Sequence, residues 1–149
     1  SVGPAHVLDL RPVQRRERIS VERLRPWEHL IRPGCRVLLH TAWSDHADEP
    51  DYRTDLPSLS LDLAEWLVER QVALLGIDTP SVGDLNDPAH LAAVHETLLG
   101  GGVILVEDLV GLARLRQTPV QFIALPLKVL DGDATPVRAV AIEDSSCGD

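Results

Sequence analysis

The sequence contains no methionine, two cysteines and few aromatic residues. Aromatic residues make up 3% of the 149 residues, so an aliphatic core of Leu, Val, Ile and Ala is expected. Cys35 and Cys147 are too few for a disulfide framework and give no sign of an oxidising compartment. No apolar run approaches the length of a membrane span, and no secretory signal pattern is visible. We therefore expect a cytoplasmic protein without a membrane partner.

Basic residues are also scarce. The formal net charge is -9, which disfavours nucleic acid as a partner because binding to phosphates depends on Lys and Arg. The one basic cluster, Arg11 to Arg18, is interpreted as a solvated surface. The length is sufficient for one domain with its own core, so residues 1–149 are expected to form a single domain.

Aliphatic patterning predicts an alternation of strands and helices. Helix and strand alternate through residues 60–107, which predicts a parallel βαβ unit. The segments "VQFIALPLKVL" and "PVRAVAIE" are predicted to form an antiparallel hairpin with a tight turn at Asp131–Asp133. The predicted class is therefore α/β, with a mixed sheet that contains a βαβ unit and a C-terminal antiparallel hairpin. Further strands are predicted at 5–10 and 36–43, and helices around 20–31, at 60–70 and within 88–100.

Two acidic residues follow neighbouring strands of the predicted βαβ unit. Asp78 comes after "VALLGI" and Glu107 after "GVILV", and the loop that begins "DTPS" carries Ser81. Ligands bind preferentially at the carboxyl edge of parallel strands, so these residues are candidates for a site. Composition leaves open the alternative that they are ordinary loop or capping residues.

His95 is a second candidate, because imidazole nitrogens and carboxylate oxygens are common ligands of zinc and manganese. If its helix begins at Pro88, His95 lies about 10 Å along it at 1.5 Å per residue, which we expect to be far from Glu107. If the helix begins near 91–94, His95 falls in the first turn, close to that edge. Composition alone favours a structural histidine beside Leu98 and Leu99.

A third stretch, "HADEP", contains His46, Asp48 and Pro50 in the spacing H-x-D-x-P, with His40 a few residues earlier. It lies in a polar segment between a predicted strand and a predicted helix. Short clusters of His and Asp arise easily in such loops, so we interpret it as a loop and not as a metal site.

Several stretches together resemble one family. They are "RVLLHTAW", "LAEWLVERQVALLGIDTPSV", "HETLLGGGVILVEDL" and "FIALPLKVLDGDATPVRAVAIE". They are similar to the cyclase family of metal-dependent hydrolases, which includes kynurenine formamidases (arylformamidases) and isatin hydrolases. The most specific pieces are "GIDTPS" and the pattern H-x-x-L-L…E, and the resemblance extends over nearly the whole chain.

The resemblance implies a swivelling β/β/α fold, a divalent metal (zinc or manganese) and hydrolysis of a C–N bond in N-formylkynurenine or a related amide or lactam. It implies that His95 and Glu107 are metal ligands, and that Asp78 and Ser81 shape the loop near the substrate. Family members are commonly oligomers, so a homo-oligomer is expected.

The chain departs from the family pattern at one point. The family signature H-x-G-T-H-x-D-x-P-x-H, which supplies most metal ligands and the catalytic histidine, belongs before "GPAHVLDL" and is not found. A catalytic zinc usually takes three protein ligands, so we expect this chain alone to be inactive, with no catalytic residue of its own. Two alternatives stay open: the segment is present elsewhere, for example on a separate N-terminal fragment, or the chain is a degenerate, non-catalytic binding or scaffold protein.

Overall fold

The computed structural model describes residues 1–143, so Cys147 lies outside the described residues. The chain forms a six-stranded sheet in the order β6-β5-β3-β1-β7-β8 and a small sheet of β2 and β4. The strands are β1 (Val2–Asp9), β2 (Arg18–Ile19), β3 (Arg36–His40), β4 (Ser58–Leu59), β5 (Leu74–Ile77), β6 (Ile104–Val106), β7 (Val120–Pro126) and β8 (Val137–Ile142); the helices are α1 (Val21–Leu24), α2 (Leu61–Glu69) and α3 (Pro88–Gly100), with 3-10 turns η1 (Arg25–Leu30), η2 (Trp43–His46) and η3 (Leu112–Arg114).

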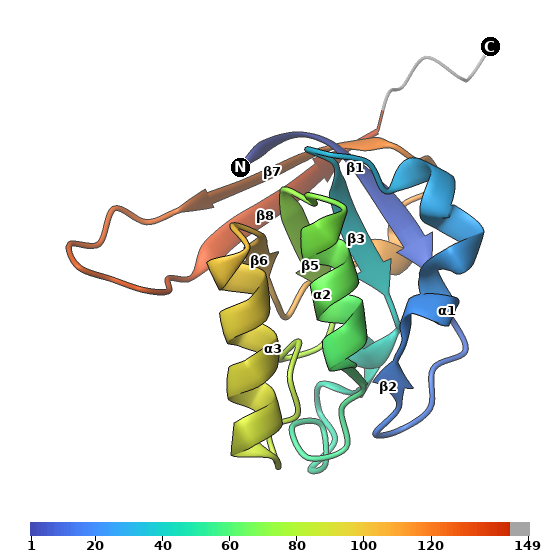
Figure 1. Cartoon of the computed structure of the whole chain (residues 1–149). Helices are drawn as coiled ribbons and strands as arrows, with labels where there is room; N and C mark the ends of the chain where they lie inside the picture. The colour runs from blue at the N-terminus through green and yellow to red at the C-terminus, as the bar shows by residue number, and fades with distance from the viewer. Residues whose placement is uncertain (144–149) are drawn as a thin grey trace.

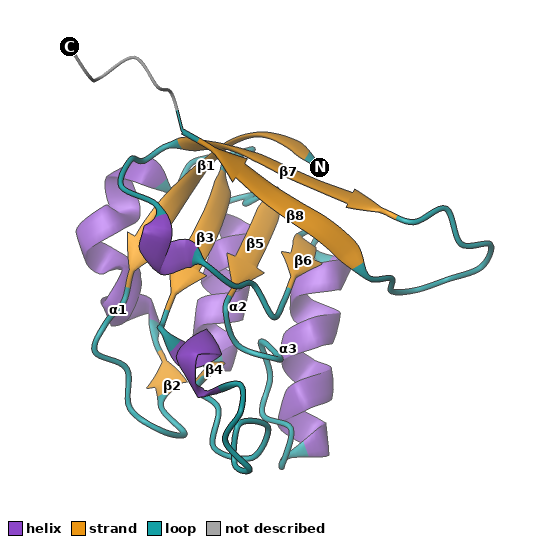
Figure 2. Cartoon of the chain, turned by 180° about the vertical axis from the view of Figure 1, so that it is seen from behind, coloured by secondary structure: helices purple, strands orange, loops and turns teal. Residues whose placement is uncertain are grey.

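The sheet is mixed, which confirms the predicted α/β class. Strands β1, β3, β5 and β6 are parallel, whereas β7 is antiparallel to β1 and β8 is antiparallel to β7. Helix α3 connects β5 to β6, so the predicted βαβ unit and C-terminal hairpin are both present. The carboxyl ends of the four parallel strands consequently lie along one edge of the sheet (Figure 2).

The helices cover one face of the parallel strands (Figure 1). The core therefore consists of two clusters of buried side chains, one on each face of the sheet. Alternate residues of each strand point to opposite faces, so Leu39 and Ile77 pack toward the helices while Leu38 and Leu74 pack on the other face. Leu63 of α2 and Leu98 of α3 belong to the helix-side cluster and are fully buried. This packing fixes α3 against the sheet.

Within residues 1–143, no helix combines the length and apolarity needed to cross a bilayer.

The hairpin of β7 and β8 differs from the sequence-based expectation. Pro126 pairs with Val137, so the connection spans residues 127–136 and the tight turn predicted at Asp131–Asp133 is wrong. Pro126 and Pro136 have no N–H to donate, which ends the ladder early. The connection projects from the body of the molecule (Figure 1) and exposes several apolar side chains, among them Leu127 and Leu130.

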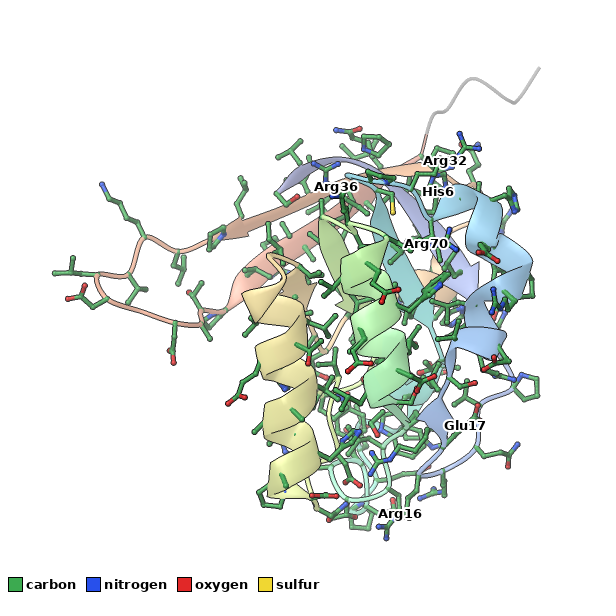
Figure 3. The ribbon with its side chains drawn as sticks, in the orientation of Figure 1. His6, Arg16, Glu17, Arg32, Arg36 and Arg70 are labelled. Atoms are coloured by element: carbon green, nitrogen blue, oxygen red, sulfur yellow. The ribbon has the colours of Figure 1, made fainter. Side chains whose placement is uncertain are left out.

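The basic cluster lies near the carboxyl edge and is largely paired with acids, as its interpretation as a solvated surface predicts. Arg11 pairs with Asp9 at 2.7 Å and Arg15 with Glu49 at 2.6 Å. Arg16 is exposed and lies at the end of the molecule opposite Arg36, the first residue of β3 (Figure 3).

Candidate metal centre

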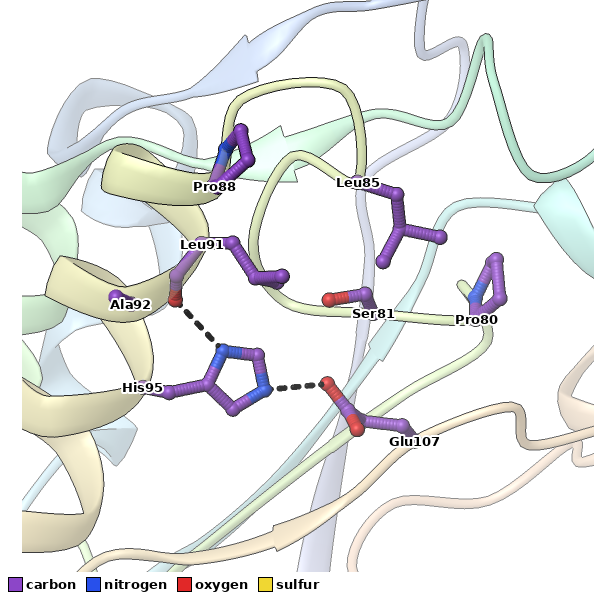
Figure 4. A pocket seen from close by; sticks show the side chains of 8 residues that line it. All are labelled: Pro80, Ser81, Leu85, Pro88, Leu91, Ala92, His95 and Glu107. Carbon is purple, nitrogen blue, oxygen red and sulfur yellow. Dashed lines mark hydrogen bonds and ion pairs between the residues drawn. The ribbon is translucent and has the colours of Figure 1, made fainter.

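His95 and Glu107 meet at the carboxyl edge of β6. The Nε2 atom of His95 lies 3.3 Å from Oε1 of Glu107, and both side chains are about 70% buried, with exposed fractions of 27% and 30% (Figure 4). Glu107 directly follows β6, as expected for a residue at this edge. The sequence-based placement of Glu107 is therefore confirmed.

The expectation that a helix beginning at Pro88 would hold His95 far from Glu107 is wrong. Helix α3 begins at Pro88, with the Asp87 side chain accepting a hydrogen bond from the His90 backbone, so His95 lies mid-helix. The 13 residues of α3 rise about 20 Å at 1.5 Å per residue, whereas the 3 residues of β6 span only about 10 Å. The first half of α3 therefore extends past the strand, and mid-helix is level with Glu107.

The ring of His95 is held from its other side. Its Nδ1 lies 2.9 Å from the carbonyl oxygen of Leu91, one helical turn earlier. Because a carbonyl oxygen only accepts hydrogen bonds, Nδ1 carries a hydrogen and donates it, which leaves Nε2 directed at Glu107. The hydrogen bond to Glu107 raises the pKa of His95, although burial opposes this shift.

The carboxylate of Glu107 is also fixed by the loop that precedes α3. Its Oε1 accepts a hydrogen bond from the backbone N–H of Val82 at 2.8 Å. This bond joins the end of β6 to the loop after β5. The two side chains of the pair are thus each anchored by a main-chain group.

The pair borders a cleft of about 450 Å³ between the loop and α3 (Figure 4). Ser81 lines this cleft, and its buried Oγ accepts a hydrogen bond from the Gly83 backbone. Most of the remaining wall is apolar. The lining residues are Pro80, Ser81, Leu85, Pro88, Leu91, Ala92, His95 and Glu107.

Asp78, a substrate-loop candidate from the sequence, is not among the residues that line this cleft. Asp78 is fully buried, and its carboxylate accepts hydrogen bonds from Thr41 N (2.9 Å), Thr41 Oγ1 (2.6 Å) and Ala42 N (2.8 Å). Burial raises its pKa, and the bonds from Thr41 partly offset that effect. Asp78 therefore shapes the turn after β3, where Ala42 has a φ of 65°.

The geometry of the pair fits two ligands of one divalent ion. Bonds of about 2.0–2.2 Å, at tetrahedral or octahedral angles, place two ligand atoms about 2.8–3.6 Å apart. The observed 3.3 Å lies in this range. The Leu91 contact is the outer hydrogen bond that metal-binding histidines typically make.

A third ligand is not found among residues 1–143, where no three side chains of His, Cys, Asp or Glu are placed to hold a metal together. In the "HADEP" stretch, His46 instead pairs with Glu49 at 2.8 Å. His40, at the end of β3, lies 3.8 Å from Asp9. Residues 47–57, between η2 and β4, form neither helix nor strand, as the interpretation of most of this segment as a loop predicts.

Two supporting contacts were not anticipated from the sequence. The Leu91 carbonyl follows from helix geometry once His95 is known to lie mid-helix, because residues four apart share a face. The Val82 N–H has no such signal, since it depends on the path of an irregular loop.

Comparison with known proteins places the chain among the cyclases. The model of the family described as "Putative cyclase" matches residues 1–84. Kynurenine formamidase of Bacillus cereus is 36% identical over 139 residues, which make up 93% of this chain and 62% of the relative. The chain thus spans less than two thirds of the length of that relative.

Solved structures of two other proteins have a fold similar to that of this chain. A potential metal-dependent hydrolase with cyclase activity matches 94% of this chain and 64% of its own, with a TM-score of 0.72 and 30% identity. Isatin hydrolase A from Ralstonia solanacearum matches 95% of this chain and 60% of its own, with a TM-score of 0.75 and 25% identity. The family model matches more than half of the residues of this chain, and the chain therefore belongs to the cyclase family.

Proposed function

We propose that this chain forms part of a metal-dependent hydrolase that cleaves a C–N amide bond, with His95 and Glu107 as two ligands of zinc or manganese. The contact of 3.3 Å between Nε2 and Oε1 carries the proposal, because two anchored donor atoms at that separation suit one divalent ion. The similarity to a kynurenine formamidase and to a metal-dependent hydrolase supports it. The expected substrate is N-formylkynurenine or a related amide or lactam.

The chain's own residues prepare the site. The Leu91 carbonyl fixes the hydrogen on Nδ1 of His95, so that Nε2 presents its lone pair once it is deprotonated. The Val82 N–H orients the carboxylate of Glu107. A divalent metal supplies Lewis acidity, which polarises a carbonyl and lowers the pKa of water. The apolar wall that includes Pro80, Leu85 and Leu91 suits the hydrocarbon part of an amide substrate.

The remaining ligands are proposed to come from outside the described residues. A catalytic zinc usually has three protein ligands, whereas residues 1–143 contain no group of three side chains placed to hold a metal. Another segment of the same protein, a separate polypeptide or another copy in a homo-oligomer would supply them. The homo-oligomer stays a prediction, which light scattering on the purified chain would check.

Zinc titration of the full chain tests the proposal. We expect weak binding of one Zn²⁺ per chain, and a loss of at least about tenfold in affinity in both His95→Ala and Glu107→Ala. His29→Ala and Glu96→Ala are matched controls, because both side chains are exposed outside the cleft lining. Unchanged zinc binding in His95→Ala would refute the assignment.

A non-catalytic binding or scaffold function is the second candidate, and the lack of a third ligand among residues 1–143 favours it. The two functions differ in one assay. Release of formate from N-formylkynurenine by the full-length gene product carrying this sequence, lost in Glu107→Ala, supports the hydrolase. Zinc binding without hydrolysis of any amide or lactam supports the binding protein.

A further inference from the structure

A hydrogen bond from a distant loop reaches the residue next to Glu107. The hydroxyl of Tyr52 donates to Oδ1 of Asp108 at 2.5 Å, although the two residues are 56 positions apart in the sequence. Tyr52 belongs to the segment of residues 43–57 between β3 and β4, which we name the strap. The strap lies near the carboxyl edge of the sheet (Figure 2).

Asp108 sits in a constrained turn. Its φ of 59° is in the left-handed region that residues other than Gly, Asn and Asp rarely adopt. Its backbone N–H donates to the Thr79 carbonyl at 2.8 Å, and the N–H of Leu109 donates to the Ile77 carbonyl at 3.0 Å. The turn that directs Glu107 is thus tied to the end of β5 by its backbone and to the strap by its side chain.

The strap also holds the loop on the other side of Glu107. Asn86 Nδ2 donates to the Thr54 carbonyl at 2.6 Å. Asn86 belongs to the same loop as Ser81, which lines the cleft, and Val82, whose N–H binds the Glu107 carboxylate. The strap therefore contacts both segments that position the Glu107 carboxylate, the turn after β6 and the loop after β5.

Tyr52 is itself oriented by a buried neighbour. Trp43 is 4% exposed, its Nε1 donates to the Tyr52 carbonyl at 3.0 Å, and the two rings stack at 6.4 Å with an angle of 10° between their planes. The guanidinium of Arg15 lies 5.6 Å from the centre of the Trp43 ring. The phenol is thereby aimed at Asp108 by contacts that do not involve its hydroxyl.

We infer that Tyr52 is a positioning residue, whose hydroxyl acts through Asp108 to hold the Glu107 carboxylate against Val82 and His95. The inference rests on the proposed function only in taking Glu107 as a metal ligand. Removing the hydroxyl frees the Asp108 side chain and loosens the turn, while the ring and its stacking on Trp43 remain.

Four variants of the full chain test the inference, each titrated with Zn²⁺ well below its unfolding temperature. Tyr52→Phe and Asp108→Ala are each expected to weaken zinc binding about tenfold, the effect typical of outer hydrogen bonds at metal sites. The double variant should lose no more than either single variant, because both remove one bond. Asp108→Asn should retain affinity, since its amide oxygen accepts the same bond and Asn tolerates a positive φ.

Thr54→Val is the matched control. It removes a hydroxyl from the same strap, one that donates to the Asp51 carbonyl at 3.2 Å without reaching Asp108. Equal losses in Tyr52→Phe and Thr54→Val would overturn the inference, because a general loosening of the strap would then suffice. Unchanged affinity in Tyr52→Phe alongside a loss in His95→Ala would overturn it as well.

Hydrogen exchange without metal separates this inference from the proposed function. The Val82 amide should exchange at least about fivefold faster in Tyr52→Phe than in the parent chain, because its acceptor Glu107 is less firmly held. Thr54→Val should leave that rate unchanged. An unaltered Val82 rate in Tyr52→Phe refutes the positioning role, whereas unaltered zinc binding in His95→Ala refutes only the metal assignment.

Discussion

The Nε2 atom of His95 and the Oε1 atom of Glu107 lie 3.3 Å apart, although one residue is in the middle of a helix and the other follows a strand. Each is held by a main-chain partner, Leu91 O for the ring and Val82 N for the carboxylate. When His95 is protonated, the hydrogen on Nε2 lies between the two side chains. A divalent ion would replace that proton, so proton and metal compete for one position.

The first prediction concerns pH and stability in the absence of metal. The pKa of His95 is raised above its ordinary value of 6.5, chiefly by Glu107, so the folded state binds the proton more tightly than the unfolded state. This contribution to stability is fully present below about pH 6.5 and is lost as the pH rises through the higher pKa of the folded state. Guanidinium unfolding in EDTA between about pH 6 and 9 should show the fall.

Glu107→Gln is the control for this prediction, because it removes the charge and keeps the size of the side chain. The fall in the free energy of unfolding across that pH window should shrink in the variant. An identical pH profile in parent and variant would show that Glu107 does not raise the pKa of His95.

The second prediction concerns zinc and pH. Zinc needs the lone pair of Nε2, so its affinity should rise as the pH increases through the pKa of His95. The slope should approach about tenfold per pH unit below that pKa and level off above it. Zinc titrations at a series of pH values measure it, and an affinity independent of pH in this range would argue against His95 as a ligand.

The third prediction concerns the approach of the loop to α3. A Cβ atom on Gly83 would lie 2.8 Å from Cα of Leu91, so Gly83→Ala must shift the loop or the helix that carries His95. We expect a loss of about 1–3 kcal/mol in the free energy of unfolding, measured by urea denaturation, together with weaker zinc binding. Gly100→Ala is the matched control.

Gly100 ends α3 and has open space where a Cβ would be placed. Alanine there should leave stability unchanged or raise it by up to about 1 kcal/mol, because alanine has the higher helix propensity. Equal effects of the two substitutions would contradict the close contact at Gly83.

The fourth prediction separates Asp78 from the site. Asp78→Ala leaves the N–H groups of Thr41 and Ala42 without their acceptor, so we expect it to lower the free energy of unfolding by about 1–3 kcal/mol. Asp78→Asn should cost less, since one oxygen still accepts. Zinc affinity of the folded variants should stay within about twofold of the parent, as Asp78 makes no contact with the pair. A tenfold loss of zinc affinity in Asp78→Asn would instead show that Asp78 contributes to the metal site.

The order of elements was accessible from the sequence because short aliphatic segments alternate with amphipathic ones. The same alternation placed Glu107 at the carboxyl edge, and resemblance to a family pointed to His95. The level of His95 along α3 relative to Glu107 could not be predicted from the sequence, because it depends on the difference in length between α3 and β6. The first and last residues of short strands are poorly marked by composition.

Other features depend on tertiary contacts that leave no local pattern. The burial of Asp78 arises from the turn of residues 41–42 folding over the end of β5, and the link from Tyr52 to Asp108 joins segments 56 positions apart. The early end of the β7–β8 ladder could have been expected from Pro126 and Pro136, which favour a wide connection over a tight turn at 131–133.

Crystallography of the zinc-soaked chain, with anomalous data collected on both sides of the zinc absorption edge, tests the metal assignment most directly. The proposal predicts an anomalous peak about 2.0–2.2 Å from both Nε2 of His95 and Oε1 of Glu107, with Nδ1 still bound to the Leu91 carbonyl. A peak bound to other residues, or a direct hydrogen bond between His95 and Glu107 that persists at saturating zinc, would contradict it.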